Sequence, residues 1–341
     1  MTCFRAEGDD FSHFDKVIYH QQIDNVIKPI VLQFDSILKS YFLFNFLFVF
    51  IGLGEVLCLI LLFHTLIQSS LFAIGVAFPL VTLFTYFILR VYYRTKKPEQ
   101  YRAVVGKFLE SCKETINYQE GVLDHHLMLS DACCLLVESL KGREYSYFKA
   151  PRWLSMVQPL MEKASCWWSL ADLFVIKEQL LQAAVQEHIR LVKAEPTNLD
   201  AHAGLATAYV ILSGLYVDPR KGGSEDRWLP KDVYHVEIEK KFRQTAEKAI
   251  EEFKILSDYA PNEPWVHEQL ALSYHDLKMP DNEIREYEIV LKLNPEKKDI
   301  LYKLGVLYFE QGRNAAGLEI YEELKRVNYM KAETLIAFYG S

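Results

Sequence analysis

The chain contains one long stretch without a charged residue, and this stretch limits how the chain can fold. From Val56 to Leu89, 34 residues, there is no Asp, Glu, Lys or Arg. A single straight helix of this length would measure about 50 Å, whereas the hydrocarbon core of a bilayer is about 30 Å thick. We expect a break at the polar cluster Gln68-Ser69-Ser70. The pattern predicts a transmembrane helical hairpin at 41–93, with spans from about Phe42 to Ile67 and about Leu71 to Tyr92.

Basic residues flank the predicted hairpin and are absent from its turn. Lys28 and Lys39 precede the first span, and the end of the second carries Arg90, Arg94, Lys96, Lys97 and Arg102. The positive-inside rule then predicts a membrane protein with two spans and both termini in the cytoplasm. In this interpretation residues 1–40 form a cytoplasmic segment. They contain five aspartates, which is not typical of a cleaved signal peptide. The alternative is a pair of buried helices in a soluble core, but such helices rarely lack a polar face over this length.

Glu55 is the one formal charge within the predicted spans, and Pro79 lies in the middle of the second span. An intramembrane carboxylate suggests a functional site. With only His64 as another ionisable group nearby, a transporter or proton relay is poorly supported, and a glutamate that is protonated or pairs the helices is favoured. Pro79 is expected to kink its helix.

Before the hairpin, apolar residues recur at helical spacing and predict an amphipathic helix that leads into the first span. They are Ile23, Val26, Ile27, Ile30, Val31, Phe34, Ile37 and Leu38. The pattern does not decide whether this face lies on the bilayer surface or packs against the cytoplasmic domain.

Downstream of the hairpin, prolines end successive helical runs at Pro196, Pro261 and Pro295, the last two 34 residues apart. A leucine–small–tyrosine pattern follows each proline at the same offsets of 9, 10 and 13 residues. Its members are Leu205, Ala206 and Tyr209, then Leu270, Ala271 and Tyr274, then Leu304, Gly305 and Tyr308. A small residue and an aromatic also recur before the prolines or the chain end, as Ala249 and Phe253, Tyr287 alone, and Gly317 and Tyr321, with Ala184 and His188 in a weaker unit.

The period and these residues resemble the tetratricopeptide repeat family. The resemblance covers about residues 164–341 and implies an all-α solenoid of antiparallel helix pairs, with a capping helix at about 331–339. Since one pair cannot bury its own apolar face, several must stack. Residues 94–163 are predicted to be a helical connector, or a degenerate repeat, between hairpin and array. An insertion at about 213–236 interrupts the first clear unit with a basic, aromatic loop that either binds something or is an inert elaboration.

The same resemblance implies a concave groove lined by the first helix of each pair. The groove positions in this chain are Trp265, Glu268, Leu272, His275, Asp276, Asp299, Tyr302, Phe309 and Glu310. Family members that hold acidic peptide C-termini use lysine, arginine and asparagine here, so an aromatic and acidic groove disfavours that ligand. We expect a protein or peptide partner with apolar and basic residues. The alternative is that Trp265 and Phe309 pack on neighbouring units.

The composition and motifs do not support catalysis or nucleic-acid binding. The formal net charge is −7, whereas nucleic-acid binding requires a basic face. Asp124, His125, His126, Cys133 and Cys134 are the only dense group of metal-capable residues, and their spacing matches no zinc motif. Six cysteines, two of them adjacent, indicate a reducing compartment rather than a disulfide scaffold. We therefore expect no enzymatic activity, no cofactor and no metal.

These features together predict a membrane-anchored scaffold or adaptor that binds protein partners through its groove on the cytoplasmic side. An alternative function follows from a second resemblance over residues 41–93. The paired spans with a minimal turn resemble the bilobed hydrophobic domain of chlamydial inclusion membrane proteins, which implies a bacterial secreted effector with its array facing a host cytosol. The sequence names neither the partner nor the oligomeric state.

Overall fold

The computed structural model describes residues 13–66, 71–150, 152–222, 228–230 and 233–340. Over these residues it contains helices and no strand, which confirms the all-α prediction. The turn predicted at Gln68-Ser69-Ser70 and part of the insertion lie outside the described residues. Two compact units are described separately: the hairpin unit, residues 10–119 and 135–180, and the array unit, residues 120–134 and 181–341.

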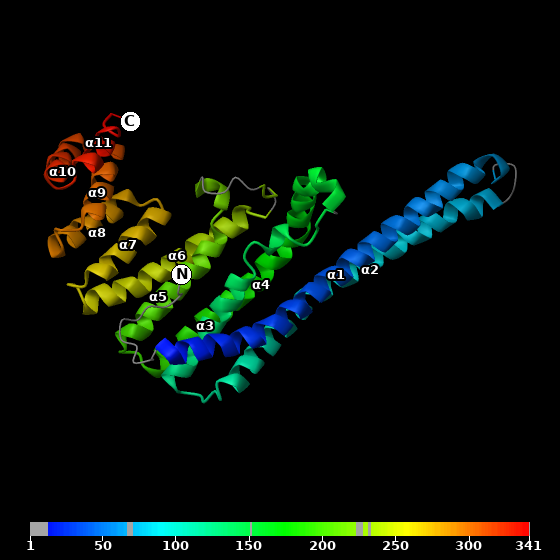
Figure 1. Ribbon diagram of the computed structural model, residues 1–341, viewed down its shortest axis with the longest axis horizontal. Helices are drawn as coiled ribbons and strands as arrows, with labels where there is room; N and C mark the ends of the chain where they lie inside the picture. Colours follow the sequence, from blue (N-terminus) through cyan, green and yellow to red (C-terminus); the bar gives the residue numbers. More distant parts are fainter. Residues whose placement is uncertain (1–12, 67–70, 151, 223–227, 231–232, 341) are drawn as a thin grey trace. The chain divides into compact units, whose positions relative to one another are not determined.

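The hairpin unit is built on two long helices that pack against each other, α1 (His13–Leu66) and α2 (Leu71–Thr115) (Figure 1). Both helices continue past the predicted span ends at Phe42 and Tyr92. The unit also contains the end of α3 (Leu123–Ser139), the short helices η1 (Arg143–Tyr145) and η2 (Arg152–Val157), and the first part of α4 (Gln158–Ala194).

The N-terminal half of α1 packs its apolar stripe inside the hairpin unit, so the structure decides between the two placements that the sequence leaves open. The buried members are Ile23, Ile27, Ile30, Val31, Phe34 and Leu38. The Phe34 ring lies 5.4 Å from the ring of Tyr101 on α2. Asp35, beside this stripe, accepts hydrogen bonds from Arg143 Nη1 at 2.9 Å and from the Tyr147 hydroxyl at 3.0 Å. These contacts join α1 to the segment that includes η1.

The distal parts of α1 and α2 expose large apolar side chains over their whole length. Two segments, Tyr19–Phe63 and Phe72–Thr115, are long and apolar enough to cross a membrane, with peak mean hydropathies of 2.8 and 2.2. The few polar side chains here pair between the helices. Thr82 Oγ1 donates to Glu55 Oε1 at 2.6 Å, and the Tyr86 hydroxyl donates to Asn45 Oδ1 at 2.9 Å. Glu55 thus takes the helix-pairing role that we expect for it.

The array unit consists of antiparallel helix pairs, in which α5 (Leu199–Tyr216) packs on α6 (Val236–Tyr259), α7 (Pro264–Asp276) on α8 (Pro280–Leu293), and α9 (Lys298–Glu310) on α10 (Asn314–Val327). Each pair also packs on the next, through α6 with α7 and α8 with α9. The final helix, α11 (Tyr329–Ile336), covers α9 and α10. The C-terminal half of α4 and the start of α3 belong to the same unit.

Candidate partner-binding face

Small residues let the helices of the array approach closely. In the first helices, Ala206, Ala271 and Gly305 are buried at equivalent positions. A Cβ atom on Gly305 would lie 2.7 Å from Leu335 Cδ2 and 2.9 Å from Ile320 Cγ2, closer than carbon atoms can pack. The small residue of the leucine–small–tyrosine pattern therefore sets how closely the helices pack. This spacing in turn sets the positions of the side chains on the solvent-exposed face of the first helices.

Two buried histidines, His202 on α5 and His267 on α7, each connect a first helix to its surroundings, a feature that sequence reasoning missed. His202 Nδ1 lies 2.6 Å from Glu252 Oε2 and its Nε2 lies 3.1 Å from the Pro196 carbonyl oxygen. His267 repeats this arrangement, with Glu286 Oε2 at 2.7 Å and the Pro261 carbonyl at 3.0 Å. Both histidines stand six residues after a repeat proline, which is the signal that could have identified them.

The structure places all of the predicted groove residues on α7 and α9, with unequal exposure. The exposed members are Trp265, Leu272, His275, Asp276, Asp299 and Glu310, and the half-buried members are Glu268 and Tyr302. The Trp265 ring meets the Phe253 ring of α6 edge-on at 5.8 Å but stays 40% exposed. Trp265 and Leu272 therefore supply the apolar surface of this face.

Phe309 departs from the expectation, because its side chain is only 2% exposed. It lies in a core cluster with Leu301, Leu324 and Leu335, and its ring meets the Tyr339 ring edge-on at 5.7 Å. The cause is Gly317 on α10, which leaves space that the Phe309 ring fills. Phe309 thus belongs to the core, as in the alternative considered from sequence, and we remove it from the candidate face.

An acidic cluster, which we define as Asp276, Glu283 and Glu310, lies on α7, α8 and α9. Glu283 is only 4% exposed, and both of its carboxylate oxygens lie within 3.2 Å of His275 Nδ1. Burial raises the pKa of the Glu283 carboxyl; nearby His275 lowers it and Glu310 raises it further. Partial desolvation likewise raises the pKa of Asp276, and nearby His275 opposes that shift. These shifts mean that ionising Glu283 and Asp276 costs more free energy than ionising a fully hydrated carboxyl group.

Glu283 was missed because the groove positions were mapped onto first helices alone. It stands 34 residues after Ala249 and 34 before Gly317, at the small position of the second helix. A carboxylate where the neighbouring repeats have alanine and glycine is the signal that could have identified it.

Two other acidic groups on the face already have basic partners within the chain. Lys297 pairs with Glu268, and Lys331 of α11 pairs with Asp299. The Lys331 ammonium lowers the pKa of Asp299. The negative charge that can attract a partner is therefore concentrated in the acidic cluster rather than spread over all of the predicted acidic residues.

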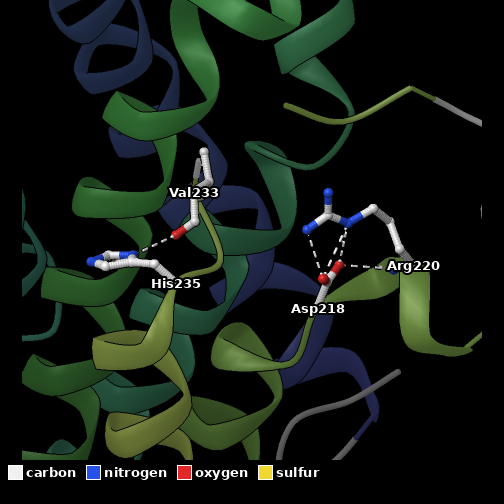
Figure 2. Close-up of polar contacts among 4 residues, drawn as sticks. All are labelled: Asp218, Arg220, Val233 and His235. Carbon is white, nitrogen blue, oxygen red and sulfur yellow. Dashed lines mark hydrogen bonds and ion pairs between the residues drawn. The ribbon is translucent and has the colours of Figure 1, made fainter. Parts of the chain in front are cut away.

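The described part of the insertion is less basic than its sequence indicates. Figure 2 shows Arg220 turned back on Asp218, whose carboxylate accepts from Arg220 Nε at 2.8 Å and from Nη2 at 2.7 Å. His235, just before α6, lies with Nδ1 3.2 Å from the Val233 carbonyl oxygen. Arg227 and Lys231 lie outside the described residues. The Arg220 charge is thus neutralised locally.

The metal-capable residues of α3 do not form a metal-binding group in the part of the chain that the structure describes. His126 Nδ1 lies 2.8 Å from Glu187 Oε2 on α4, and Arg190 Nη1 donates to the other oxygen of Glu187 at 2.5 Å. Nearby on α4, His188 occupies the aromatic position of its repeat and is buried, which lowers its pKa to about 4. We interpret this cluster as core structure.

Comparisons with known proteins returned only solved structures. No protein-family model and no curated protein matches the chain. MamA of AMB-1 is 16% identical with a TM-score of 0.34, covering 73% of this chain and 99% of its own. A thermophilic TPR protein of Thermus thermophilus, TTC0263, is 16% identical with a TM-score of 0.32, covering 63% and 91%. YrrB, a TPR protein described as having an unusual peptide-binding site, is 13% identical with a TM-score of 0.33, covering 66% and 97%.

These scores are low, and the evidence for the repeat type lies in the chain itself. The chain shows the paired helices α5–α6, α7–α8 and α9–α10 and the 34-residue spacing of Pro261 and Pro295. It also buries Ala206, Ala271 and Gly305 at matching positions of the first helices. Residues 199–327 thus form an α-solenoid of antiparallel helix pairs whose pattern resembles that of tetratricopeptide repeats.

Proposed function

We propose that the array is a protein-interaction scaffold, and that its candidate face binds a segment carrying apolar anchors and basic side chains. The observation that carries this proposal is the exposed pair Trp265 and Leu272 beside the acidic cluster. An exposed tryptophan is typical of the few residues that dominate a protein interface, and α7 carries both Trp265 and Asp276 of the acidic cluster. YrrB, by its description, has a peptide-binding site on the same type of fold.

The charge of the cluster predicts the character of the binding. Glu283 is desolvated, and the nearby Glu310 raises the pKa of its carboxyl group further. Asp276 interacts electrostatically with His275, which lowers the pKa of Asp276. A lysine or arginine of the partner would replace the lost hydration, and the attraction would weaken as salt is added because exposed charges are screened within about 8–10 Å.

We further propose that the hairpin anchors the chain in a membrane, with both termini and the array on the cytoplasmic side. Its exposed apolar surface supports this, as does the pairing of Glu55 with Thr82 and of Asn45 with Tyr86, since polar groups in lipid must be satisfied within the protein. The basic residues at the outer ends of the spans support the orientation.

Affinity capture with the full chain in detergent tests the binding proposal. Trp265→Ala and the double variant Asp276→Asn, Glu310→Gln should each lose partners that the wild type captures. The matched control is Glu322→Gln, which removes an exposed carboxylate from the second helix α10. We expect losses of about 5- to 30-fold in the test variants, corresponding to roughly 1–2 kcal/mol. An unchanged partner set in both test variants would contradict the proposal.

Alkaline carbonate extraction tests the anchoring, and protease treatment of intact cells tests the orientation. The full chain should stay in the membrane pellet, and a C-terminal tag should survive external protease until the cells are opened. Release of the chain into the carbonate supernatant would contradict the anchoring, and loss of the tag in intact cells would contradict the orientation.

A further inference from the structure

The hairpin unit exposes a second apolar surface, separate from its two long helices. Along η2 and the start of α4, Trp153 is 82% exposed, Met156 94%, Leu160 64% and Trp167 66%. Their spacings of three, four and seven residues place them along one side of consecutive helical turns. Large apolar side chains that cluster on a surface mark an interaction site rather than a chance exposure. We call these four residues the aromatic platform.

The platform is fixed to α1 where the exposed apolar part of the hairpin begins. The Phe42 ring lies 4.9 Å from the Phe148 ring and 5.5 Å from the Trp168 ring, in edge-on contact with the latter. Phe42 also stacks on Phe46, the next exposed aromatic along α1. The segment that carries the platform therefore contacts α1 at Phe42, through Phe148 and Trp168, where the exposed apolar surface of the hairpin begins.

Polar contacts hold this segment rigidly. The Tyr147 amide donates to Ser165 Oγ at 3.0 Å, and Ser165 Oγ donates to the Glu144 carbonyl at 2.7 Å. The Ala150 amide donates to Gln158 Oε1 at 3.0 Å, so this bond connects the residues on either side of η2. Asp35, seven residues or about 10 Å before Phe42 on α1, binds Arg143 and Tyr147. Lys97 Nζ of α2 pairs with Asp172 of α4 at 2.6 Å. The exposure of the platform is therefore built into the unit.

We propose that the aromatic platform inserts into the headgroup region of the same bilayer that holds the hairpin, as a second, interfacial membrane contact. Tryptophan is enriched at this depth because its ring is apolar and its N–H still reaches polar groups. Exposed Lys149 and Lys163 flank the platform and match the charge of lipid phosphates. The level of Phe42 fixes the depth, since the exposed apolar surface of the hairpin starts there. The expected depth of the platform depends on the membrane anchoring of the hairpin that is proposed above.

Quenching of tryptophan fluorescence by brominated lipid tests this contact in the full chain. The chain has five tryptophans. One variant keeps Trp153 and replaces the others by phenylalanine; the matched control keeps Trp265, on the array. Both are reconstituted in phosphatidylcholine–phosphatidylglycerol vesicles, with bromine either near the headgroup end or near the methyl end of the acyl chains. We expect the shallow bromines to lower Trp153 emission by about half and the deep ones to lower it less, with Trp265 unaffected.

A second variant tests the insertion of the platform independently. Met156→Asp in the Trp153-only chain places a charge on the most exposed platform position, where it should not disturb the fold. It should restore most of the Trp153 emission in shallow-brominated vesicles, whereas Leu272→Asp on the array should not.

Trp153 emission unchanged by both brominated lipids would overturn the platform proposal, even if the chain resists carbonate extraction. A blue-shifted but unquenched Trp153 would also overturn it, because a protein surface or a second copy would then cover the platform. Carbonate release combined with strong Trp153 quenching would instead refute the hairpin anchoring and leave the platform contact standing.

Discussion

Gly317 offers the sharpest test of how the last repeat packs. A Cβ atom built on this residue would lie 2.5, 2.6 and 2.9 Å from Phe309 Cε1, Cδ1 and Cζ. Optimal carbon–carbon contacts are about 3.5–4.0 Å, so Gly317→Ala forces about 1 Å of movement. The Phe309 ring is enclosed by Leu324, Leu335 and Tyr339 and has little space to move into.

Overpacking of this kind costs about 1–3 kcal/mol, whereas replacing a helical glycine by alanine gains about 1 kcal/mol. We therefore expect Gly317→Ala to lower the local free energy of unfolding by roughly 1 kcal/mol. The matched control is Gly214→Ala on α5, where a Cβ atom would meet nothing within 4 Å. The control should stabilise its helix by up to about 1 kcal/mol. The same chemical change thus has opposite signs at the two positions.

Hydrogen exchange of the full chain in detergent, followed by mass spectrometry, measures both effects locally. Amides of α9 and α10 should exchange about fivefold faster in Gly317→Ala, and amides of α5 should exchange more slowly in Gly214→Ala. Adding Phe309→Leu to Gly317→Ala should cost less than the two separate changes together, because a smaller side chain relieves the overlap. Slower or unchanged exchange of α9 and α10 in Gly317→Ala would refute this account of the packing.

Three further changes test other parts of the array, each by thermal or chemical denaturation. Lys278→Gly should stabilise by about 1 kcal/mol, because Lys278 has φ of 58° where the next repeat has Gly312; a destabilised variant would contradict this. Burial lowers the pKa of His188 from 6.5 to about 4, so the wild type should lose up to about 3 kcal/mol of stability as pH falls through that range. His188→Phe should remove this loss. Equal pH profiles of stability for the two proteins would contradict the prediction. The pKa of Glu283 is raised, so its contribution to the free energy of unfolding is complete below the ordinary carboxyl pKa range and is lost as pH rises through the raised pKa. Glu283→Gln should abolish that decline in stability.

The repeat architecture could be predicted from sequence because its determinants are local and periodic. Leu270, Ala271 and Tyr274 take the same positions as Leu304, Gly305 and Tyr308, and each set must face the same neighbours. Helix ends in the hairpin unit could not be predicted in this way. Hydropathy records where the surroundings change from apolar to polar, while α1 and α2 continue through that change as regular helix.

The candidate face was only partly predictable, because exposure depends on residues far away in the chain. Position alone assigns Phe309 to the groove, but Gly317 on the next helix decides that its ring is buried. Lys297 and Lys331 neutralise Glu268 and Asp299, and neither pairing follows from the repeat pattern. The aromatic platform was missed because Trp153, Met156 and Leu160 have the same spacing as an ordinary buried helix face.

The uninterrupted course of α1 and α2 has a mechanical consequence under the proposed anchoring. Ile23–Leu38 and the apolar stretch beyond Phe42 share one helix, and α2 carries Tyr101 on the same helix as Thr82. A helix is stiff over such lengths unless a proline bends it, as Pro29 and Pro98 can. A change in bilayer thickness that tilts the hairpin would therefore also move the residues around Asp35 and Tyr101, which lie on the same two helices. Two continuous helices would transmit such a tilt, whereas a flexible linker would not.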